Sequence, residues 1–212
     1  MVEWCWRAAE AARLGPVLVA TDAREVADEV RRFGGHAVMT SPSCPSGSDR
    51  VWLAARGRRE PIILNYQGDM PLLKAATLRA VVKSLSRGTH IATAVIPIVT
   101  ERRADDPNVV KAVLAESGRC LYFSRAKLPC SRDGERTRRW EHLGLYAYRR
   151  EALRRFVALP PSELERTEKL EQLRALEAGM TMRAAVVCER PVSVDAPADL
   201  RRVQRLLLRG NQ

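Results

Sequence analysis

The chain has 212 residues, 46% hydrophobic and 29% charged, which is the composition of an ordinary globular protein with one domain and a substantial core. This composition excludes collagen-like, fibrous and disordered chains. The longest apolar runs fall far short of the ~20 residues that a membrane span needs. Because no apolar leader opens the printed sequence, we also expect a protein that is not secreted.

The net charge is +11, and all but five of the 36 basic residues are arginine. This skew is more typical of a codon-composition bias than of nucleic-acid binding, and the few aromatic residues do not alternate with basic ones. The five cysteines are scattered and form no CxxC pair, so they predict reduced thiols in a cytoplasmic protein. Neither nucleic acid nor a membrane is therefore an expected partner.

In the first half of the chain, apolar runs of strand length alternate with amphipathic runs of helix length. This alternation predicts an α/β fold with a mostly parallel sheet. The expected helices are 4–13, 24–33, 49–56 and 73–86. The expected strands are 16–20, 36–40, 61–66 and 91–99. A loop of Ser, Pro, Gly and Cys is expected at 41–48.

The second half changes character and contains a predicted β-hairpin around the turn residues 116–118. The expected strands are 109–114, 120–123, 143–148 and 183–188. The expected helices are 150–158, 164–178 and 198–208, the second of them with leucines along one stripe.

The segment 65–69 (NYQGD) follows a buried strand, and ligands of open α/β sheets bind at the carboxyl ends of the strands. Gly68 allows a sharp turn there, and Asp69 presents a carboxylate that suits Mg²⁺. A plain helix cap explains Asp69 equally well. Asp195 lies between a strand and a helix that begins near Pro197, so taken alone it reads as an N-cap, whereas paired with Asp69 it could complete a metal site.

Other polar segments carry weaker signals. The loop 46–50 (SGSDR) opens into a helix and could hold a base or a phosphate, but it lacks the spacing of a P-loop. His142 reads most simply as a hydrogen-bonded histidine at a strand end, and Glu171 as a solvated helix charge. Nucleophilic catalysis is not indicated, because the sequence has no GxSxG and no cysteine with a histidine nearby.

Eight segments, in order along nearly the whole chain, resemble one family, the 3-deoxy-manno-octulosonate (KDO) cytidylyltransferases, also called CMP-KDO synthetases. The segments are VATDAREV (19–26), SGSDRV (46–51), QGDMP (67–71), DPNVVKAVL (106–114), LYFSRAKLP (121–129), HLGLYAYR (142–149), PSELERTEKLEQLR (161–174) and VDAPADL (194–200). The combination of LYFSR, HLGLYAYR and LEQLR is specific to that family.

The resemblance implies a Rossmann-like nucleotide-diphospho-sugar transferase fold, with a β-rich subdomain at about 106–160 that binds sugar and forms a homodimer. It implies that CTP and KDO give CMP-KDO, a precursor for lipopolysaccharide, and pyrophosphate. Asp69 and Asp195 would be the catalytic residues and would hold Mg²⁺. The residues implied to bind the substrates are Ser46, Gly47, Gln67, Arg125, His142, Tyr146, Glu171 and Gln172.

Three departures from the family pattern stand out. Family members open with a strand and a basic loop of the type PARxxSxRLPGKPL, whereas this sequence matches only from just after that loop, roughly 30 residues later, the scale of one supersecondary unit. Met70 replaces the acid of QGDEP, and Cys44-Pro45 replaces His-Gln. We therefore keep, as alternatives to the enzyme, a catalytically impaired relative that retains only fold and dimer and, on charge alone, a nucleic-acid-binding protein.

Overall fold

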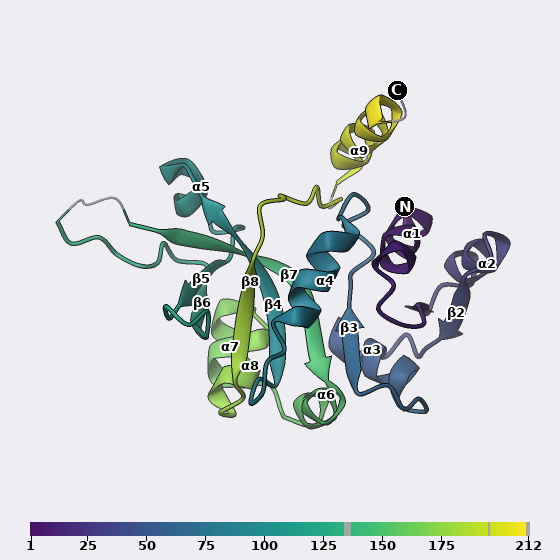
Figure 1. Cartoon of the computed structure of the whole chain (residues 1–212), viewed down its shortest axis with the longest axis horizontal. Coiled ribbons are helices and arrows are strands. Elements are labelled where there is room, and N and C mark those ends of the chain that lie inside the picture. The colour runs from purple at the N-terminus through teal and green to yellow at the C-terminus, as the bar shows by residue number, and fades with distance from the viewer. Residues whose placement is uncertain (134–136, 195, 211–212) are drawn as a thin grey trace. The chain divides into compact units, whose positions relative to one another are not determined.

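The computed structural model describes residues 1–133, 137–194 and 196–210, which form two compact units (Figure 1). Unit 1 comprises Met1–Arg58, Tyr66–Arg79 and Glu189–Gln212. Unit 2 comprises Arg59–Asn65 and Ala80–Cys188, so it contains the whole of segment 106–160.

Unit 1 is built on a short pair of parallel strands, β1 and β2, in which Leu18 lies opposite His36. Helix α2 packs against both strands and buries Ala27 and Val30 completely. The chain leaves α2 through a turn that requires glycine. A Cβ on Gly35 would lie 2.9 Å from the side chain of Val30 and 2.8 Å from the ring of Phe33. The α2 turn thereby returns the chain tightly to β2. The elements of unit 1 are α1 (Val2–Ala12), β1 (Leu18–Thr21), α2 (Arg24–Arg32), β2 (His36–Met39), α3 (Gly47–Ala55) and α9 (Pro197–Gly210).

Unit 2 contains a six-stranded sheet in the order β6-β5-β7-β4-β8, with β3 also paired to β7. Helix α6 packs against β3 and β7, and α8 packs against β6 (Figure 1). The strands are β3 (Ile62–Asn65), β4 (Ile91–Ile98), β5 (Lys111–Leu114), β6 (Cys120–Ser124), β7 (Arg139–Arg149) and β8 (Met182–Val186). The helices are α5 (Glu101–Asp105), α6 (Arg150–Val157), α7 (Glu163–Glu168) and α8 (Gln172–Glu177), and α4 (Ala75–Lys83) begins in unit 1 and ends in unit 2.

The α/β class is confirmed, but the prediction of a mostly parallel sheet is wrong for unit 2, in which every strand pair except β4 with β8 is antiparallel. Strand β7 lies antiparallel to β4 along its whole length and antiparallel to β3 near its end. Because β4 and β8 are parallel, the strands β3, β4 and β8 all run in one direction, and β7 is inserted between β3 and β4 in the opposite direction. The parallel set that the sequence pattern predicts is therefore present but interrupted.

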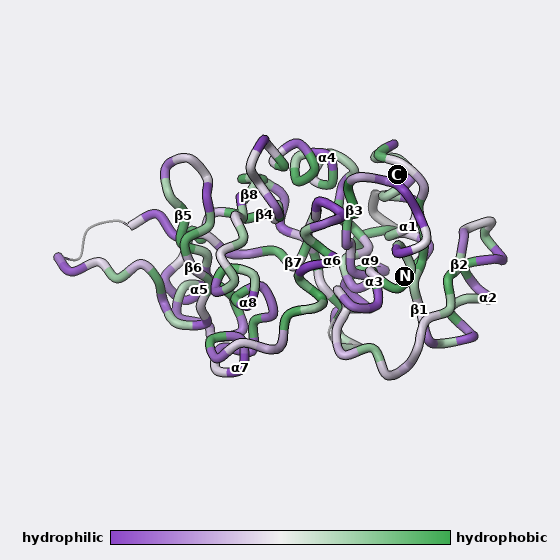
Figure 2. Tube along the Cα trace, turned by 90° about the horizontal axis from the view of Figure 1, so that it is seen from below, coloured by the Kyte–Doolittle hydropathy of each residue, from purple (hydrophilic) through white to green (hydrophobic). Residues whose placement is uncertain are grey.

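The core of unit 2 lies on β4, whose first six residues are all buried, as expected for an apolar strand covered on both faces. Leu145 on β7 and Leu153 and Phe156 on α6 are almost fully buried beside it. Figure 2 shows apolar residues along strands such as β3 and β7, and hydrophilic residues on helices such as α2 as well as in loops. None of the described helices is both long and apolar enough to cross a membrane.

The single helix predicted at 164–178 is wrong, because two helices occupy this stretch. Helix α7 begins with a capping box between Ser162 and Glu165 and ends at Lys169, whose φ of 55° is left-handed. A lysine in this conformation carries no local sequence signal, since glycine or asparagine is the usual residue there. The sequence also gave no indication of α5, which Thr100 caps by accepting a hydrogen bond from the backbone N–H of Arg103.

We expect Leu153→Ala to lower the free energy of unfolding by about 2–5 kcal/mol, because it opens a cavity in the core of unit 2. The matched control is Leu121→Ala, at a side chain that is 45% exposed, which should cost ~0.5 kcal/mol. Urea unfolding followed by circular dichroism measures both. Equal losses in the two variants would contradict the assignment of Leu153 to the core.

Candidate active site

In unit 1, the loop that follows β3 is held by groups from its surroundings. The hydroxyl of Tyr66 donates to the carbonyl of Met70 at 2.6 Å, and the thiol of Cys5 donates to the carbonyl of Gly68 at 3.4 Å. Burial raises the pKa of Cys5, so the thiol keeps the proton that it donates. Gln67 and Gly68 themselves are exposed. The loop thus presents an ordered backbone with an accessible tip.

Asp69 lies in this loop beside a segment that is distant in sequence. Its Oδ2 accepts from the hydroxyl of Ser193 at 3.3 Å, and its carbonyl accepts from the backbone N–H of Val194 at 2.9 Å. The fold therefore brings residues 193–194 to Asp69. The next residue, Asp195, lies outside the described residues.

The oxygen atoms around Asp69 are of the kind that a magnesium ion accepts. A carboxylate and a hydroxyl are hard donors, and Mg²⁺ commonly takes only one or two protein carboxylates and completes its shell with water or phosphate. Among the described residues, His, Cys, Asp and Glu side chains form no group of three or more that could hold a metal ion. The donor set at Asp69 thus fits a site that relies on few protein ligands.

Ser46 is the N-cap of α3. Its hydroxyl accepts from the backbone N–H of Asp49 at 3.2 Å and donates to the Asp49 carboxylate at 2.7 Å. Gly47 follows, and a Cβ there would meet nothing within 4 Å, so the packing gives no steric reason for glycine. Arg50, one turn into α3, donates to Thr40 Oγ1 at 2.7 Å and to Asp22 at 2.9 Å.

Thr40 follows β2 and Asp22 follows β1, so Arg50 joins the start of α3 to the ends of both strands. This is the edge of a parallel sheet at which ligands commonly bind. The SGSDR loop was expected from its sequence to hold a base or a phosphate, but this role of its arginine was not predicted. The role depends on contacts between distant segments.

In unit 2, Arg125 follows β6 and is held by carbonyls of two other segments. Its Nε donates to the carbonyl of Glu168 at 2.8 Å, and its Nη1 donates to the carbonyl of Pro107 at 3.1 Å. The Glu168 carboxylate accepts from the backbone N–H of Arg125 at 2.9 Å and from the hydroxyl of Ser124 at 2.6 Å. The guanidinium is thereby oriented through neutral acceptors.

Lys111 supports the region around Arg125. It is fully buried, and its ammonium donates to the carbonyls of Asp106, Val109 and Arg125. Burial lowers the pKa of Lys111. Neither Lys111 nor Glu168 was predicted from the sequence, although a single lysine within the apolar run VVKAVL was a usable signal for Lys111.

His142 and Tyr146 lie on β7 with their ring centroids 5.4 Å apart, and His142 also packs edge-on against Phe123 at 4.8 Å. The His142 Nε2 lies 2.9 Å from the hydroxyl of Thr93 on β4. Burial lowers the pKa of His142 to about 3, so the ring is neutral at physiological pH. Phe123 is two residues before Arg125, so His142, Tyr146 and Arg125 belong to one region of unit 2.

The last two residues predicted to bind the substrate, Glu171 and Gln172, lie at the junction between α7 and α8. Burial raises the pKa of Tyr146 well above its usual value, and the nearby charge of Glu171 adds to the effect. Glu171 also accepts from Arg174 at 3.2 Å. Gln172 is 6% exposed, and within the described part of the chain its Nε2 has no hydrogen-bond partner. A buried amide without a partner is costly, so it is a group that a polar ligand would satisfy.

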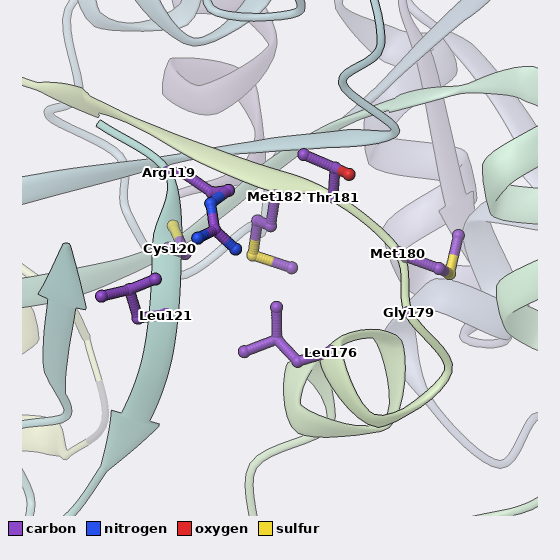
Figure 3. Close-up of a pocket in the computed structure, with 8 residues that line it drawn as sticks. All are labelled: Arg119, Cys120, Leu121, Leu176, Gly179, Met180, Thr181 and Met182. Carbon is purple, nitrogen blue, oxygen red and sulfur yellow. The ribbon is translucent and has the colours of Figure 1, made fainter. Parts of the chain in front are cut away.

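A separate cavity of about 190 Å³ lies between β6, the end of α8 and the start of β8 (Figure 3). The side chains of Leu176 and Met182 face each other across it. Its lining is Arg119, Cys120, Leu121, Leu176, Gly179, Met180, Thr181 and Met182, and includes none of the predicted site residues. The chemistry described above does not involve this cavity.

The fold is that of a nucleotidyltransferase. The structure superposes with a TM-score of 0.94 on a CMP:2-keto-3-deoxy-manno-octonic acid synthetase complexed with CTP, at 33% identity over 99% of this chain and 88% of that one. A nucleotidyl transferase from Methanothermobacter, at 17% identity and a TM-score of 0.64, shares the fold alone. The family described as "Cytidylyltransferase" matches residues 1–182.

The curated relatives narrow this class further. The 3-deoxy-manno-octulosonate cytidylyltransferase of Rhodospirillum centenum is 52% identical over 94% of this chain and 80% of its own length. The enzyme of the same name from Methylobacterium radiotolerans is 50% identical over 98% of this chain and 86% of its own length. The chain therefore belongs to the 3-deoxy-manno-octulosonate cytidylyltransferase family, and the resemblance inferred from its motifs is confirmed.

We expect the neutral, buried ring of His142 to make the protein less stable in mild acid. The unfolded chain takes up a proton near pH 6.5, whereas the folded ring does so only near pH 3, so stability is present above pH 6.5 and is lost as the pH falls toward 3. The slope approaches at most ~1.4 kcal/mol per pH unit.

Urea unfolding of the wild type and of His142→Gln between pH 7 and pH 5 measures this effect. The variant should lose less stability over that range. His36→Gln, at an exposed position of β2, is the matched control and should follow the wild type. Parallel stability curves for wild type and His142→Gln would contradict the lowered pKa.

Proposed function

We propose that this chain is an enzyme that transfers CMP from CTP to the anomeric hydroxyl of KDO. The hydroxyl oxygen forms a bond to the α-phosphorus, the bond to the β-phosphate oxygen breaks, pyrophosphate leaves with that electron pair, and the hydroxyl proton passes to solvent. The observation that carries the proposal is the near-full-length match, at about 50% identity, to curated enzymes named for this sugar. Such a transfer needs positioning and charge neutralisation more than covalent catalysis.

The residues proposed to bind the nucleotide and the metal belong to unit 1. Asp69 and Asp195 would hold Mg²⁺, which when bound neutralises phosphate charge and polarises the attacking hydroxyl. The contact of Asp69 with residues 193–194 supports this pairing. Ser46 and Gly47, at the start of α3, would line the cytidine pocket, and Gln67 would lie by the sugar.

Most of the residues proposed to bind the sugar belong to unit 2. KDO carries one carboxylate and many hydroxyls, so its site needs one cation and several hydrogen-bonding groups. Arg125 is suited to the carboxylate, because its own acceptors are neutral carbonyls and guanidinium N–H groups remain to be used. His142, Tyr146, Glu171 and Gln172 would bind the hydroxyls, and the buried amide of Gln172 supports this role.

We further propose that segment 106–160 covers the sugar and contributes to a homodimer in the cytoplasm. Support for the first part comes from Arg125, His142 and Tyr146, which all belong to this segment. All five cysteines are free, which supports a reducing compartment. Sedimentation of the purified chain would give one species of twice the chain mass if the homodimer forms, and a monomer would contradict it.

We expect Asp69→Asn to lower kcat for CMP-KDO formation about a hundredfold or more, because the amide no longer offers a full negative charge to a metal ion. Pyrophosphate release from CTP, KDO and Mg²⁺ measures the rate. Asp28→Asn, in an exposed ion pair on α2, is the control and should leave the rate unchanged. Equal rates for the wild type and Asp69→Asn would contradict the role of Asp69, and no turnover by the 212-residue chain would favour the impaired alternative.

We expect Arg125→Lys to raise the KM for KDO about tenfold or more and to leave the KM for CTP nearly unchanged. Lysine keeps the charge but loses the planar fork that pairs with a carboxylate. Initial rates with one substrate varied at a time separate the two constants. Arg154→Lys, in an exposed pair on α6, is the matched control. Equal increases in both KM values would contradict a specific role in sugar binding.

A further inference from the structure

Strand β7 contains an irregularity at the place where it carries the predicted sugar-binding residues. Along β4, Thr93 lies opposite Tyr146, but its neighbour Ala94 lies opposite Leu143. Residues 144–145 are therefore extra on β7, and they form a β-bulge. Bulges interrupt the hydrogen-bond ladder and change the direction of nearby side chains, and they are frequent beside active sites.

The hydroxyl of Thr93 fills the interior of this bulge. Thr93 is fully buried, and its Oγ1 lies 2.8 Å from the carbonyl oxygen of Leu145 and 3.1 Å from that of Leu143. It also lies 2.9 Å from Nε2 of His142. One hydroxyl thus joins the two carbonyls of the bulge to the imidazole.

Counting protons at this hydroxyl determines the direction of each hydrogen bond. A hydroxyl has one proton to donate, and carbonyl oxygens can only accept. If Thr93 donated to His142 instead, two carbonyl oxygens would face its lone pairs in a buried site, at the full cost of unmade hydrogen bonds. The Thr93 proton therefore points to the carbonyls, and Nε2 of His142 donates to Oγ1.

This direction determines where the single proton of the neutral imidazole lies. With the proton on Nε2, the other nitrogen, Nδ1, carries a lone pair and can only accept. Within the described part of the chain, no hydrogen bond to Nδ1 of His142 is present. The ring is thus left with one acceptor to offer to a ligand.

We infer that Thr93 is a positioning residue that fixes His142 as the Nε2-protonated tautomer, so that Nδ1 accepts a hydrogen bond from a hydroxyl group of the sugar acid. The second half of this inference rests on the proposed function, which assigns His142 to sugar binding. The first half concerns the chain alone and is measurable without any substrate.

The tautomer is read from the ¹⁵N chemical shifts of the imidazole nitrogens in the full chain labelled at its three histidines. His142 should show a protonated Nε2 and an unprotonated Nδ1. His90 provides an internal reference, because its Nδ1 accepts from the backbone N–H of Thr181 at 2.9 Å and so has the same tautomer. The variant His142→Gln assigns the signals. A protonated Nδ1 in wild-type His142 would overturn the inference.

Three variants separate the hydroxyl from the fold. Thr93→Val removes the hydroxyl and should shift His142 toward a mixture of tautomers, whereas Thr93→Ser keeps the hydroxyl and should preserve the wild-type shifts. Thr89→Val is the matched control, because Thr89 is also a buried threonine but its hydroxyl contacts Ser86. Unchanged His142 shifts in a folded Thr93→Val would overturn the inference, and if that variant does not fold, the wild-type measurement still decides it.

Kinetics test the link to the sugar. Thr93→Val should raise the KM for KDO roughly tenfold, the effect of one hydrogen bond, with little change in the KM for CTP. Thr93→Ser should restore it. A folded Thr93→Val with an altered tautomer and an unchanged KM for KDO would overturn the sugar-binding half. A wild type that makes no CMP-KDO would contradict the proposed function while leaving the tautomer result intact.

Discussion

The placement of β7 is the constraint on which the rest of unit 2 depends. This strand pairs along one edge with β4 and along the other with β5 and then β3, so it holds together three strands that precede it in the chain. It also carries His142 and Tyr146 and the bulge between them. The same backbone hydrogen bonds that hold the sheet together therefore set the position of the candidate sugar-binding side chains.

Sequence patterns predicted the elements of this fold well wherever the signal was local. The apolar run of β4 and the amphipathic helix α6 were both identified, because burial on two faces or one leaves a periodicity in the residues themselves. The direction of β7 was not predictable in this way, since an apolar strand has the same composition whether its neighbours run parallel or antiparallel. The break at Lys169 was missed because a lysine takes up a left-handed conformation that is usual for glycine or asparagine, with its backbone N–H bonded to the carbonyl of Glu165.

The candidate site was predictable from the sequence only through the resemblance of whole segments to a family. Taken singly, His142 was predicted to be a histidine whose hydrogen bonds are made within the protein. The structure confirms this for one of its two ring nitrogens, because Nε2 is bonded to Thr93 within the sheet. The supporting groups were missed for a physical reason. Thr93, Lys111 and Glu168 act through contacts across 50, 14 and 43 residues of sequence, and no periodicity or spacing encodes such distances.

Burial, more than net charge, determines how the sugar-binding half of the proposed site would work. Tyr146 keeps its proton and His142 stays neutral because charged forms are poorly solvated there, so one group donates and the other accepts over the whole physiological pH range. A sugar hydroxyl can both donate and accept a hydrogen bond. A set of fixed donors and acceptors would therefore select one orientation of each hydroxyl, which mobile surface charges could not do. Only the carboxylate of the sugar acid calls for a cation, which is the part that Arg125 is placed to supply.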